Sequence, residues 1–202
     1  SKSGTRWYEG WGYKNESNIY TKANYEISDK WNVNVDLQYR YVNYEIQGKN
    51  KDRIDVGQIH KYNFFNPKAG ISYTINNFNM LYLTFGATSK EPNRDDFVNG
   101  IVNNVTPKEE KLSDVELGWK KRSNKYAVEV NAYYMNYTNQ LVLTGEVNNV
   151  GEYIRINTPK SYRAGLEFSG SYNYTTRLNV SATLALSQNK IDAFTESIYQ
   201  YD

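Results

Sequence analysis

Residues 162–172 read YRAGLEFSGSY, and their apolar and polar side chains alternate with a period of two. One face would carry Tyr162, Ala164, Leu166, Phe168, Gly170 and Tyr172, and the other Arg163, Gly165, Glu167, Ser169 and Ser171. This alternation indicates a β-strand with one apolar and one polar face. Aromatic residues stand at both ends of the apolar face. Ten residues at about 3.3 Å each, tilted by about 40°, rise about 25 Å, close to the height of the apolar band of a transmembrane barrel.

The same alternation recurs along the whole chain, and no stretch of comparable length holds a helical period. Aromatic residues again bracket the apolar face from Trp31 to Tyr41 and from Tyr126 to Tyr134. The sequence predicts an all-β fold of about eight antiparallel, up-and-down transmembrane strands. They are Ile19–Ile27, Trp31–Ile46, Lys68–Ile75, Leu81–Ala87, Asp114–Lys120, Tyr126–Tyr134, Tyr162–Tyr172 and Leu178–Ser187.

The connections between these strands alternate in length. Short turns are expected at residues 28–30, 76–79, 123–124 and 175–177, and long polar loops at 47–63, 88–111 and 138–160. Short turns at one end and long loops at the other are typical of an outer-membrane barrel, with the turns in the periplasm and the loops outside the cell. The first predicted strand would then begin on the loop side and the last would end there, which would place both termini of the chain outside the cell. We therefore expect residues 1–202 to be a partial barrel domain within a larger barrel.

Composition is compatible with this interpretation. The chain has no cysteine, which excludes a disulfide framework and thiolate chemistry, and its net charge of +2 gives no sign of nucleic-acid binding. A mean hydropathy of −0.78 is expected for a barrel, since half of each strand is polar. The 20 tyrosines suit a membrane interface, where one end of the side chain is apolar and the other is wet. A soluble β-sandwich also alternates, but its strands usually run to only about 5–6 residues.

Three segments resemble TonB-dependent outer-membrane receptors. The stretch from Phe85 to Phe97 is similar to the family's strand end running into a proline-containing loop. The stretch from Asn104 to Gly118 resembles its Pro-Glu segment leading into a Glu-Leu-Gly strand, and the stretch from Asn148 to Glu167 its Asn-Gly loop and Arg-x-Gly-φ-Glu strand. The residues that carry this resemblance are Pro107, Glu109, Glu116, Leu117, Gly118, Arg163, Gly165 and Glu167.

The resemblance implies a barrel of about 22 strands whose lumen is blocked by an N-terminal plug domain. Such receptors lie in the outer membrane of Gram-negative bacteria and import a scarce nutrient with energy from the TonB complex. Partners would be outer-membrane lipid, the plug of the same protein, the TonB complex through segments outside this chain, and an extracellular nutrient. Cargo of the family includes ferric siderophores, haem, cobalamin and glycans. Haem is disfavoured because Asn93 and Arg94 stand where haem receptors have a histidine.

No residue pattern predicts catalysis, a cofactor or a metal site. The acid pairs Asp95-Asp96 and Glu109-Glu110 are interpreted as solvated loop residues, and His60 is the only histidine. Polar-face charges such as Glu129 and Arg163 are expected to form ion pairs in the lumen, between strands or with the plug. A ligand mouth is predicted in the loop from residue 91 to 110, at Asn93, Arg94, Asp95 and Phe97.

The primary hypothesis is therefore part of the wall of a nutrient-import receptor, not an enzyme. A passive porin or small structural barrel is the first alternative. A soluble β-rich binding module is the second.

Overall fold

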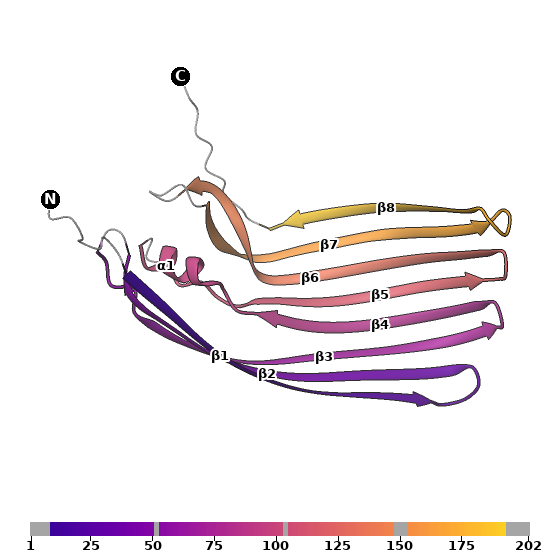
Figure 1. The fold of residues 1–202 in the computed structure, drawn as a ribbon, viewed down its shortest axis with the longest axis horizontal. Coiled ribbons are helices and arrows are strands. Elements are labelled where there is room, and N and C mark those ends of the chain that lie inside the picture. Colours follow the sequence, from indigo (N-terminus) through magenta and orange to yellow (C-terminus); the bar gives the residue numbers. More distant parts are fainter. Residues whose placement is uncertain (1–8, 51–52, 103–104, 148–152, 193–202) are drawn as a thin grey trace, which may run out of the picture.

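The computed structural model describes residues 9–50, 53–102, 105–147 and 153–192. They form one sheet of eight strands in the order β1 to β8, and every neighbouring pair is antiparallel (Figure 1). The predicted all-β, up-and-down fold is confirmed. The elements are β1 (Glu9–Glu26), β2 (Trp31–Lys49), β3 (Gln58–Asn76), β4 (Asn79–Lys90), α1 (Arg94–Val102), β5 (Glu110–Arg122), β6 (Tyr126–Val147), β7 (Tyr153–Asn173) and β8 (Asn179–Ile191).

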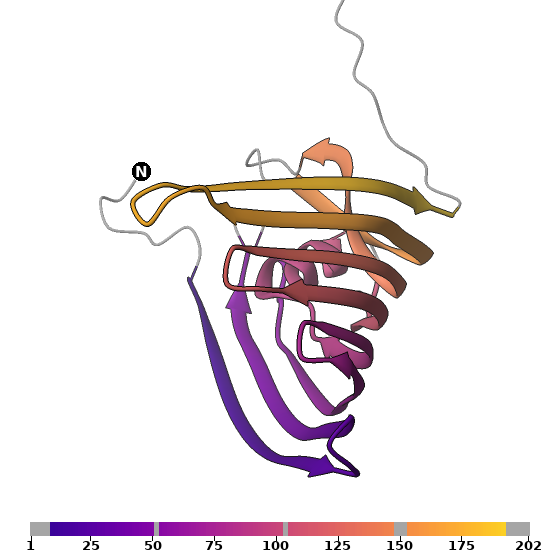
Figure 2. The same ribbon diagram turned by 90° about the vertical axis from the view of Figure 1, so that its right-hand side faces the viewer.

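The sheet curls into a trough, with α1 inside its concavity at the loop end (Figure 2). Such curvature is what a segment of barrel wall requires, because closing a sheet demands both twist and tilt of the strands. Within the described residues, β1 and β8 each pair with a single neighbour, so the trough is open along one side. No helix of the described residues is long and apolar enough to cross a membrane.

The four predicted short turns are present, and each begins with a side-chain oxygen that organises it. Ser28 accepts a hydrogen bond from the Trp31 amide at 3.3 Å. Asn76 accepts hydrogen bonds from the amides of Phe78 and Asn79 at 3.0 and 3.1 Å. Ser123 and Thr175 do the same in the remaining two turns. Short polar side chains of this kind mimic a backbone turn, which lets the chain reverse within two to five residues.

Two of the three predicted long loops are wrong, because the strands continue through them. β2 runs to Lys49 and β3 begins at Gln58, while β6 runs to Val147 and β7 begins at Tyr153. In the β6 extension the alternation that marks a strand is lost, because Leu141, Val142 and Leu143 are consecutive apolar residues. The third predicted loop, residues 88–111, is a true connection over residues 91–109, between β4 and β5, but it contains α1, which was not predicted.

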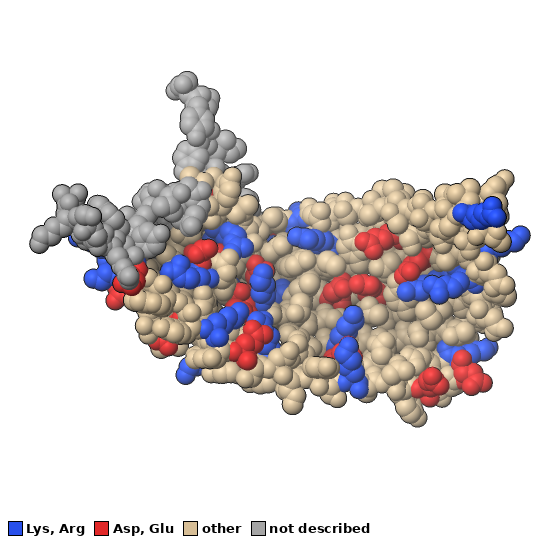
Figure 3. Space-filling model, in the orientation of Figure 1, with Lys and Arg blue, Asp and Glu red and all other residues tan. Residues whose placement is uncertain are grey.

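The polar side chains line the concave face. The ladder from β1 to β3 runs without a register shift, so Ile46 in β2 lies on the same face as Asn34. Ile46 packs against Phe97 of α1, and α1 lies inside the trough. Asn34 and its neighbours therefore face the lumen, and Figure 3, which views the concave side, shows acidic and basic residues distributed over it.

The convex face carries the apolar band. Leu166 in β7 is 42% exposed and Leu184 in β8 is 56% exposed, as expected for side chains that meet lipid. Aromatic pairs flank the band at both ends. Trp31 stacks obliquely on Tyr73 at 4.6 Å near the turns, and Tyr134 stacks on Tyr162 at 5.8 Å near the loops. This arrangement matches the predicted aromatic girdles.

Two glycines of the concave face are covered by tyrosine rings from the neighbouring strand. Gly118 in β5 pairs with Tyr82 in β4, and a Cβ at position 118 would lie 2.1 Å from the ring carbon Cζ. Gly165 in β7 pairs with Tyr133 in β6, and a Cβ there would lie 2.6 Å from the tyrosine hydroxyl. A ring lying over a strand glycine shields the exposed backbone and restores packing. The close approach of each ring gives a physical reason for the glycine in the Glu-Leu-Gly segment and in the Arg-x-Gly-φ-Glu segment.

We predict that Leu166→Arg destabilises a complete barrel containing these strands by about 2–4 kcal/mol, since it places a charge in the lipid-facing band. Ser169→Arg, on the lumen face of the same strand, is the matched control and should cost much less. Reversible unfolding in lipid vesicles measures both variants. Equal penalties would contradict the assignment of the faces.

We also predict that Gly118→Ala destabilises the barrel by about 1–3 kcal/mol, because the methyl group must displace the Tyr82 ring. Gly86→Ala is the control, since a Cβ there would meet only Lys68 Cγ, at 4.0 Å. In a double-mutant cycle, Tyr82→Ala should remove most of the extra cost of Gly118→Ala. Additive penalties would show that the ring over Gly118 does not matter.

Candidate ligand mouth and lumen wall

Helix α1 begins with a reciprocal cap. The Asn93 side chain accepts a hydrogen bond from the Asp96 amide at 2.9 Å, and the Asp96 carboxylate accepts one from the Asn93 amide at 2.9 Å. This capping box satisfies backbone donors that the first helical turn leaves free. Asp95 and Asp96 in the first turn also face the positive end of the helix dipole. A nine-residue helix is marginal alone, so its position depends on the contacts described next.

The first contact is apolar. Phe97 is 1% exposed and packs with Ile46 of β2 and Val56 of the β2–β3 connection. Its ring lies parallel to that of His60 in β3, with centroids 3.9 Å apart, and Tyr44 meets it edge-on at 6.1 Å. Burial lowers the pKa of His60, so the ring is neutral at pH 7. The only histidine is thus part of a packed cluster, and the described residues contain no group that could hold a metal ion.

The second contact is an ion pair to the opposite side of the mouth. Arg155 in the extension of β7 donates two hydrogen bonds to the Asp96 carboxylate, at 2.9 and 3.0 Å. Asp96 is only 6% exposed, and the paired geometry suits a planar guanidinium. Phe97 and Asp96, which are adjacent in sequence, therefore connect the β2–β3 hairpin to the β6–β7 hairpin.

The third contact fixes the entry to the helix. Glu91 is 6% exposed and accepts hydrogen bonds from Lys14 of β1 at 2.6 Å and from Arg40 of β2 at 2.8 and 2.9 Å. Arg40 also binds Glu16 of β1 at 2.7 Å. Burial by itself raises the pKa of the Glu91 carboxyl, but the hydrogen bonds from Lys14 and Arg40 outweigh it, so the pKa lies below its ordinary value. The carboxylate is therefore charged at neutral pH.

The predicted ligand-mouth residues divide into two groups. Asn93, Arg94 and Asp95 are exposed at the loop end of the trough, and the guanidinium of Arg94 lies over Gly10 of β1. Phe97, in contrast, lies in the buried cluster, where its role is to hold α1 on the wall. The residues that secure the helix, Glu91 and Arg155, were not predicted. Glu91 is separated in sequence from its partners Arg40 and Lys14 by 51 and 77 positions, and Arg155 is separated from Asp96 by 59 positions. Only the fold brings these residues together.

A small hollow of about 210 Å³ separates α1 from the β6–β7 extension. Pro107, one of the motif residues, lines it and packs against Gly100 at the end of the helix. A Cβ on Gly100 would lie 2.4 Å from the Val105 carbonyl oxygen, so glycine is required for this close approach. The motif proline and this glycine together return the chain from α1 towards β5.

The other motif residues lie along the wall. Glu109 forms an ion pair with Lys111 at 3.3 Å, and Arg163 lies over the Tyr137 ring at 5.2 Å. Leu117 is 57% exposed on the convex face. The interpretation of the acid pairs as solvated loop residues is wrong for Asp96, which is 6% exposed and paired with Arg155, whereas Asp95 is exposed and lies 3.8 Å from Arg94. Glu110 accepts a hydrogen bond from the Leu141 amide at 2.8 Å.

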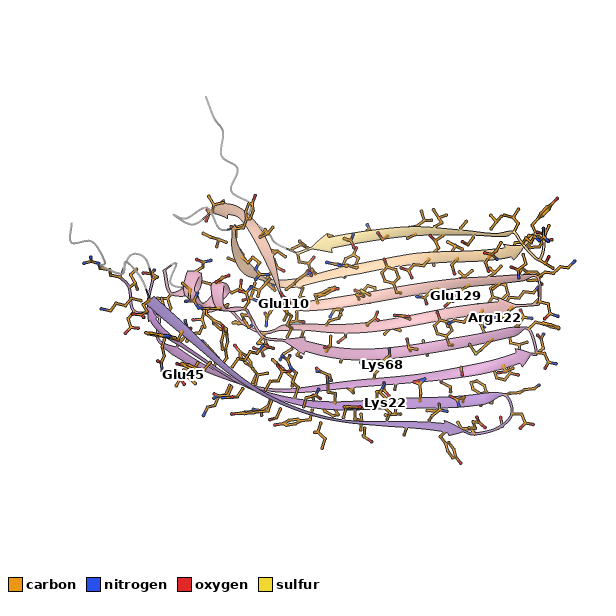
Figure 4. All side chains as sticks on the ribbon, in the orientation of Figure 1. Lys22, Glu45, Lys68, Glu110, Arg122 and Glu129 are labelled. Carbon is orange, nitrogen blue, oxygen red and sulfur yellow. The ribbon has the colours of Figure 1, made fainter. Side chains whose placement is uncertain are left out.

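The middle of the concave wall is acidic. Glu116, Glu129 and Glu167 line a hollow of about 830 Å³ that spans β2 to β8. The Tyr82 hydroxyl lies 3.0 Å from Glu129 and 3.1 Å from Asn131, and Lys120 is 3.1 Å from Glu129. In Figure 4, Glu129 and Arg122 mark the half of the wall near the turns, and Glu110 marks the loop end. The predicted ion pairing between strands is therefore confirmed for Glu129. Among the salt bridges of the described residues, Arg163 has no acidic partner, and Glu116 and Glu167 have no cationic partner.

We predict that Arg155→Met loosens α1, because it leaves the buried Asp96 carboxylate without its partner. Amide hydrogen exchange in residues 95–99 should accelerate by about tenfold or more, the result of losing roughly 1–3 kcal/mol of local stability. Arg94→Met, which removes an exposed guanidinium from the same helix, is the control. Unchanged exchange in the Arg155 variant would show that the ion pair does not hold the helix.

Comparison with known proteins assigns a family to this arrangement. The sequence model described as "TonB dependent receptor-like, beta-barrel" matches residues 3–201. No curated protein sequence matches the chain significantly.

Three solved structures with the same fold have low sequence identity to the chain. The FrpB iron transporter from Neisseria meningitidis is 16% identical with a TM-score of 0.68, over 91% of this chain and 27% of that one. The copper transporter OprC is 13% identical with a TM-score of 0.74, over 89% and 29%. The ferric citrate transporter FecA is 15% identical with a TM-score of 0.73, over 95% and 28%. The chain spans less than a third of the length of these structures.

The family is one of transport receptors of the Gram-negative outer membrane. With nearly its whole length matched by the family model, the chain belongs to the TonB-dependent receptor β-barrel family.

Proposed function

We propose that these eight strands form part of the barrel wall of an outer-membrane receptor that actively imports a scarce nutrient. The observation that carries the proposal is the opposite chemistry of the two faces. The convex face is an exposed apolar band between aromatic pairs, and the concave face is a polar wall with a helix secured in its mouth. A wall of this kind separates lipid from a polar lumen.

The lumen in this proposal is filled by the plug domain, which lies outside this chain. Glu116 and Glu167 face the concave hollow, and a plug that presents basic side chains to them would neutralise the acidic wall. The TonB complex would act on the plug side, again through segments outside this chain. The chain itself contributes the wall and part of the mouth.

The proposed cargo is a metal chelate or another compact polar nutrient. The structurally similar proteins include iron, copper and ferric citrate transporters, which favours a ferric siderophore-like cargo over cobalamin-like or glycan cargo. In the mouth, Arg94 and Asp95 are exposed and carry opposite charges. They are suited to contacting a cargo that has both donor and acceptor groups. The neighbouring Asp96 and Phe97 instead hold the helix on the wall.

We predict that uptake depends on these exposed residues. In cells that produce the full receptor, Arg94→Ala combined with Asp95→Ala should lower uptake of radiolabelled ferric chelates by about tenfold, because both contacts are lost without disturbing the helix anchors. Asp29→Ala combined with Lys30→Ala removes the same two kinds of charge from a short turn and should leave uptake unchanged.

The same assay separates active import from passive diffusion. Uptake should stop when TonB is absent or the proton gradient is dissipated. Uptake that persists without TonB would mean a passive porin. Uptake that is normal in the Arg94/Asp95 variant would place cargo recognition on the plug or on other loops.

A further inference from the structure

The wall has a seam between β3 and β4. Their ladder stops at Lys68 and Gly86, although β3 begins ten residues earlier, at Gln58, and β4 continues to Lys90. The β2–β3 and β4–β5 ladders both run on past this point. Figure 1 shows β1, β2 and β3 bending away from β4 and β5 at the loop end.

The lumen side of the seam is bridged by side chains. Asn66 accepts a hydrogen bond from the Ser89 amide at 3.0 Å, and its own amide group donates to Gln38 at 2.9 Å. Tyr62 and Phe64, which lie on the same concave side of β3, stack at 5.4 Å. A groove of about 600 Å³ remains along the seam, lined by residues 61–65, 87–89, 109 and 111–113.

Side chains of the convex face give this groove an apolar floor and a basic rim. Phe65 is 59% exposed and lies beside Ala87 at the level where the apolar band ends. Lys61 lies on the same face of β3, four residues farther toward the loop end. Lys111, across the seam in β5, is on the convex face and its side chain is 57% exposed. Glu109 lies 3.3 Å from Lys111 and is the one carboxylate in the lining.

The basic character continues around the rim. Lys111 is in register with Thr138 of β6, which is in register with Lys160 of β7. Lys160 is exposed, as is Lys190 two positions from it across the β7–β8 ladder. Lysine stems cover apolar surface while their ammonium groups stay at the polar boundary. Ammonium groups just above an apolar band are placed to meet anionic headgroups.

We propose that the seam groove binds a phosphorylated glycolipid of the outer leaflet, with a phosphate between Lys61 and Lys111 and an acyl chain against Phe65. This inference rests on the proposed outer-membrane location but not on transport. A lipid matches both halves of the groove, because its headgroup complements the lysines and its chain covers the exposed ring. A soluble anion would use only the lysines.

The test measures binding of one probe, a diphosphorylated and acylated glucosamine disaccharide, to the purified full receptor in a neutral detergent. Replacing both lysines (Lys61→Ala with Lys111→Ala) should weaken binding by about 25-fold, at roughly fivefold for each lysine near a membrane surface. Lys121→Ala is the control, since Lys121 lies on the same face of β5, ten residues away at the turn end. It should leave the affinity within about twofold.

Two further arms identify the ligand. Removing both phosphates from the probe should weaken its binding to the unaltered receptor to the level of the double variant. Inorganic phosphate at millimolar concentration should not displace the probe. The proposal is overturned if the double variant binds as the unaltered receptor does, or if the dephosphorylated probe binds equally well. It is also overturned if free phosphate competes fully, which would indicate a soluble-anion site.

Folding and transport are monitored separately, so that neither can be mistaken for the result. Heat-modifiable electrophoretic mobility confirms that the double variant forms a barrel. Binding is measured in detergent without TonB, so the lipid site is tested independently of transport. A passive pore that binds the probe would contradict the transport proposal alone, and an active importer that does not bind the probe would contradict the lipid site alone.

Discussion

Every backbone amide and carbonyl that meets the hydrocarbon core of a membrane must be paired within the protein, since lipid offers no hydrogen-bonding partner. In this chain the antiparallel ladders from β1 to β8 provide those partners across the central part of the sheet. The side chains are then free to divide into an apolar convex face and a polar concave face. Both the alternation in the sequence and the regular placement of the short turns follow from this requirement.

The constraint weakens outside the apolar band, and there the structure becomes irregular. Beyond the aromatic residues, water can satisfy the backbone, so β3 and β4 are able to separate. Residues with positive φ, Gly48, Asn139 and Gly145, occur in the extensions of β2 and β6, where the strands twist out of the regular wall. The separated strands make room for α1 in the lumen.

The sequence could predict whatever depends on period and on turn chemistry. The eight strands, the two faces and the turns headed by Ser28, Asn76, Ser123 and Thr175 follow from local patterns. The extension of β6 could not be predicted from its period, since Leu141, Val142 and Leu143 are consecutive and apolar and polar residues no longer alternate there. Helix α1 had one local signal, the Asn93-x-x-Asp96 capping pattern after Pro92, which is short and was outweighed by the polar composition of the segment. Its docking depends on Arg155 and Arg40, which no local pattern connects to it.

Helix α1 lies at the level where β3 and β4 separate, and it contacts the wall on both sides of the seam. Phe97 holds the β2–β3 hairpin through the cluster with Ile46 and His60, and Asp96 holds the β6–β7 hairpin through Arg155. The β2–β3 and β6–β7 hairpins do not pair with each other in the described sheet, so α1, which contacts both, connects them at this level. Residues 91–97 therefore contact both sides of the seam from the lumen, through Glu91 and Phe97 on the β1–β3 side and through Asp96 on the β6–β7 side.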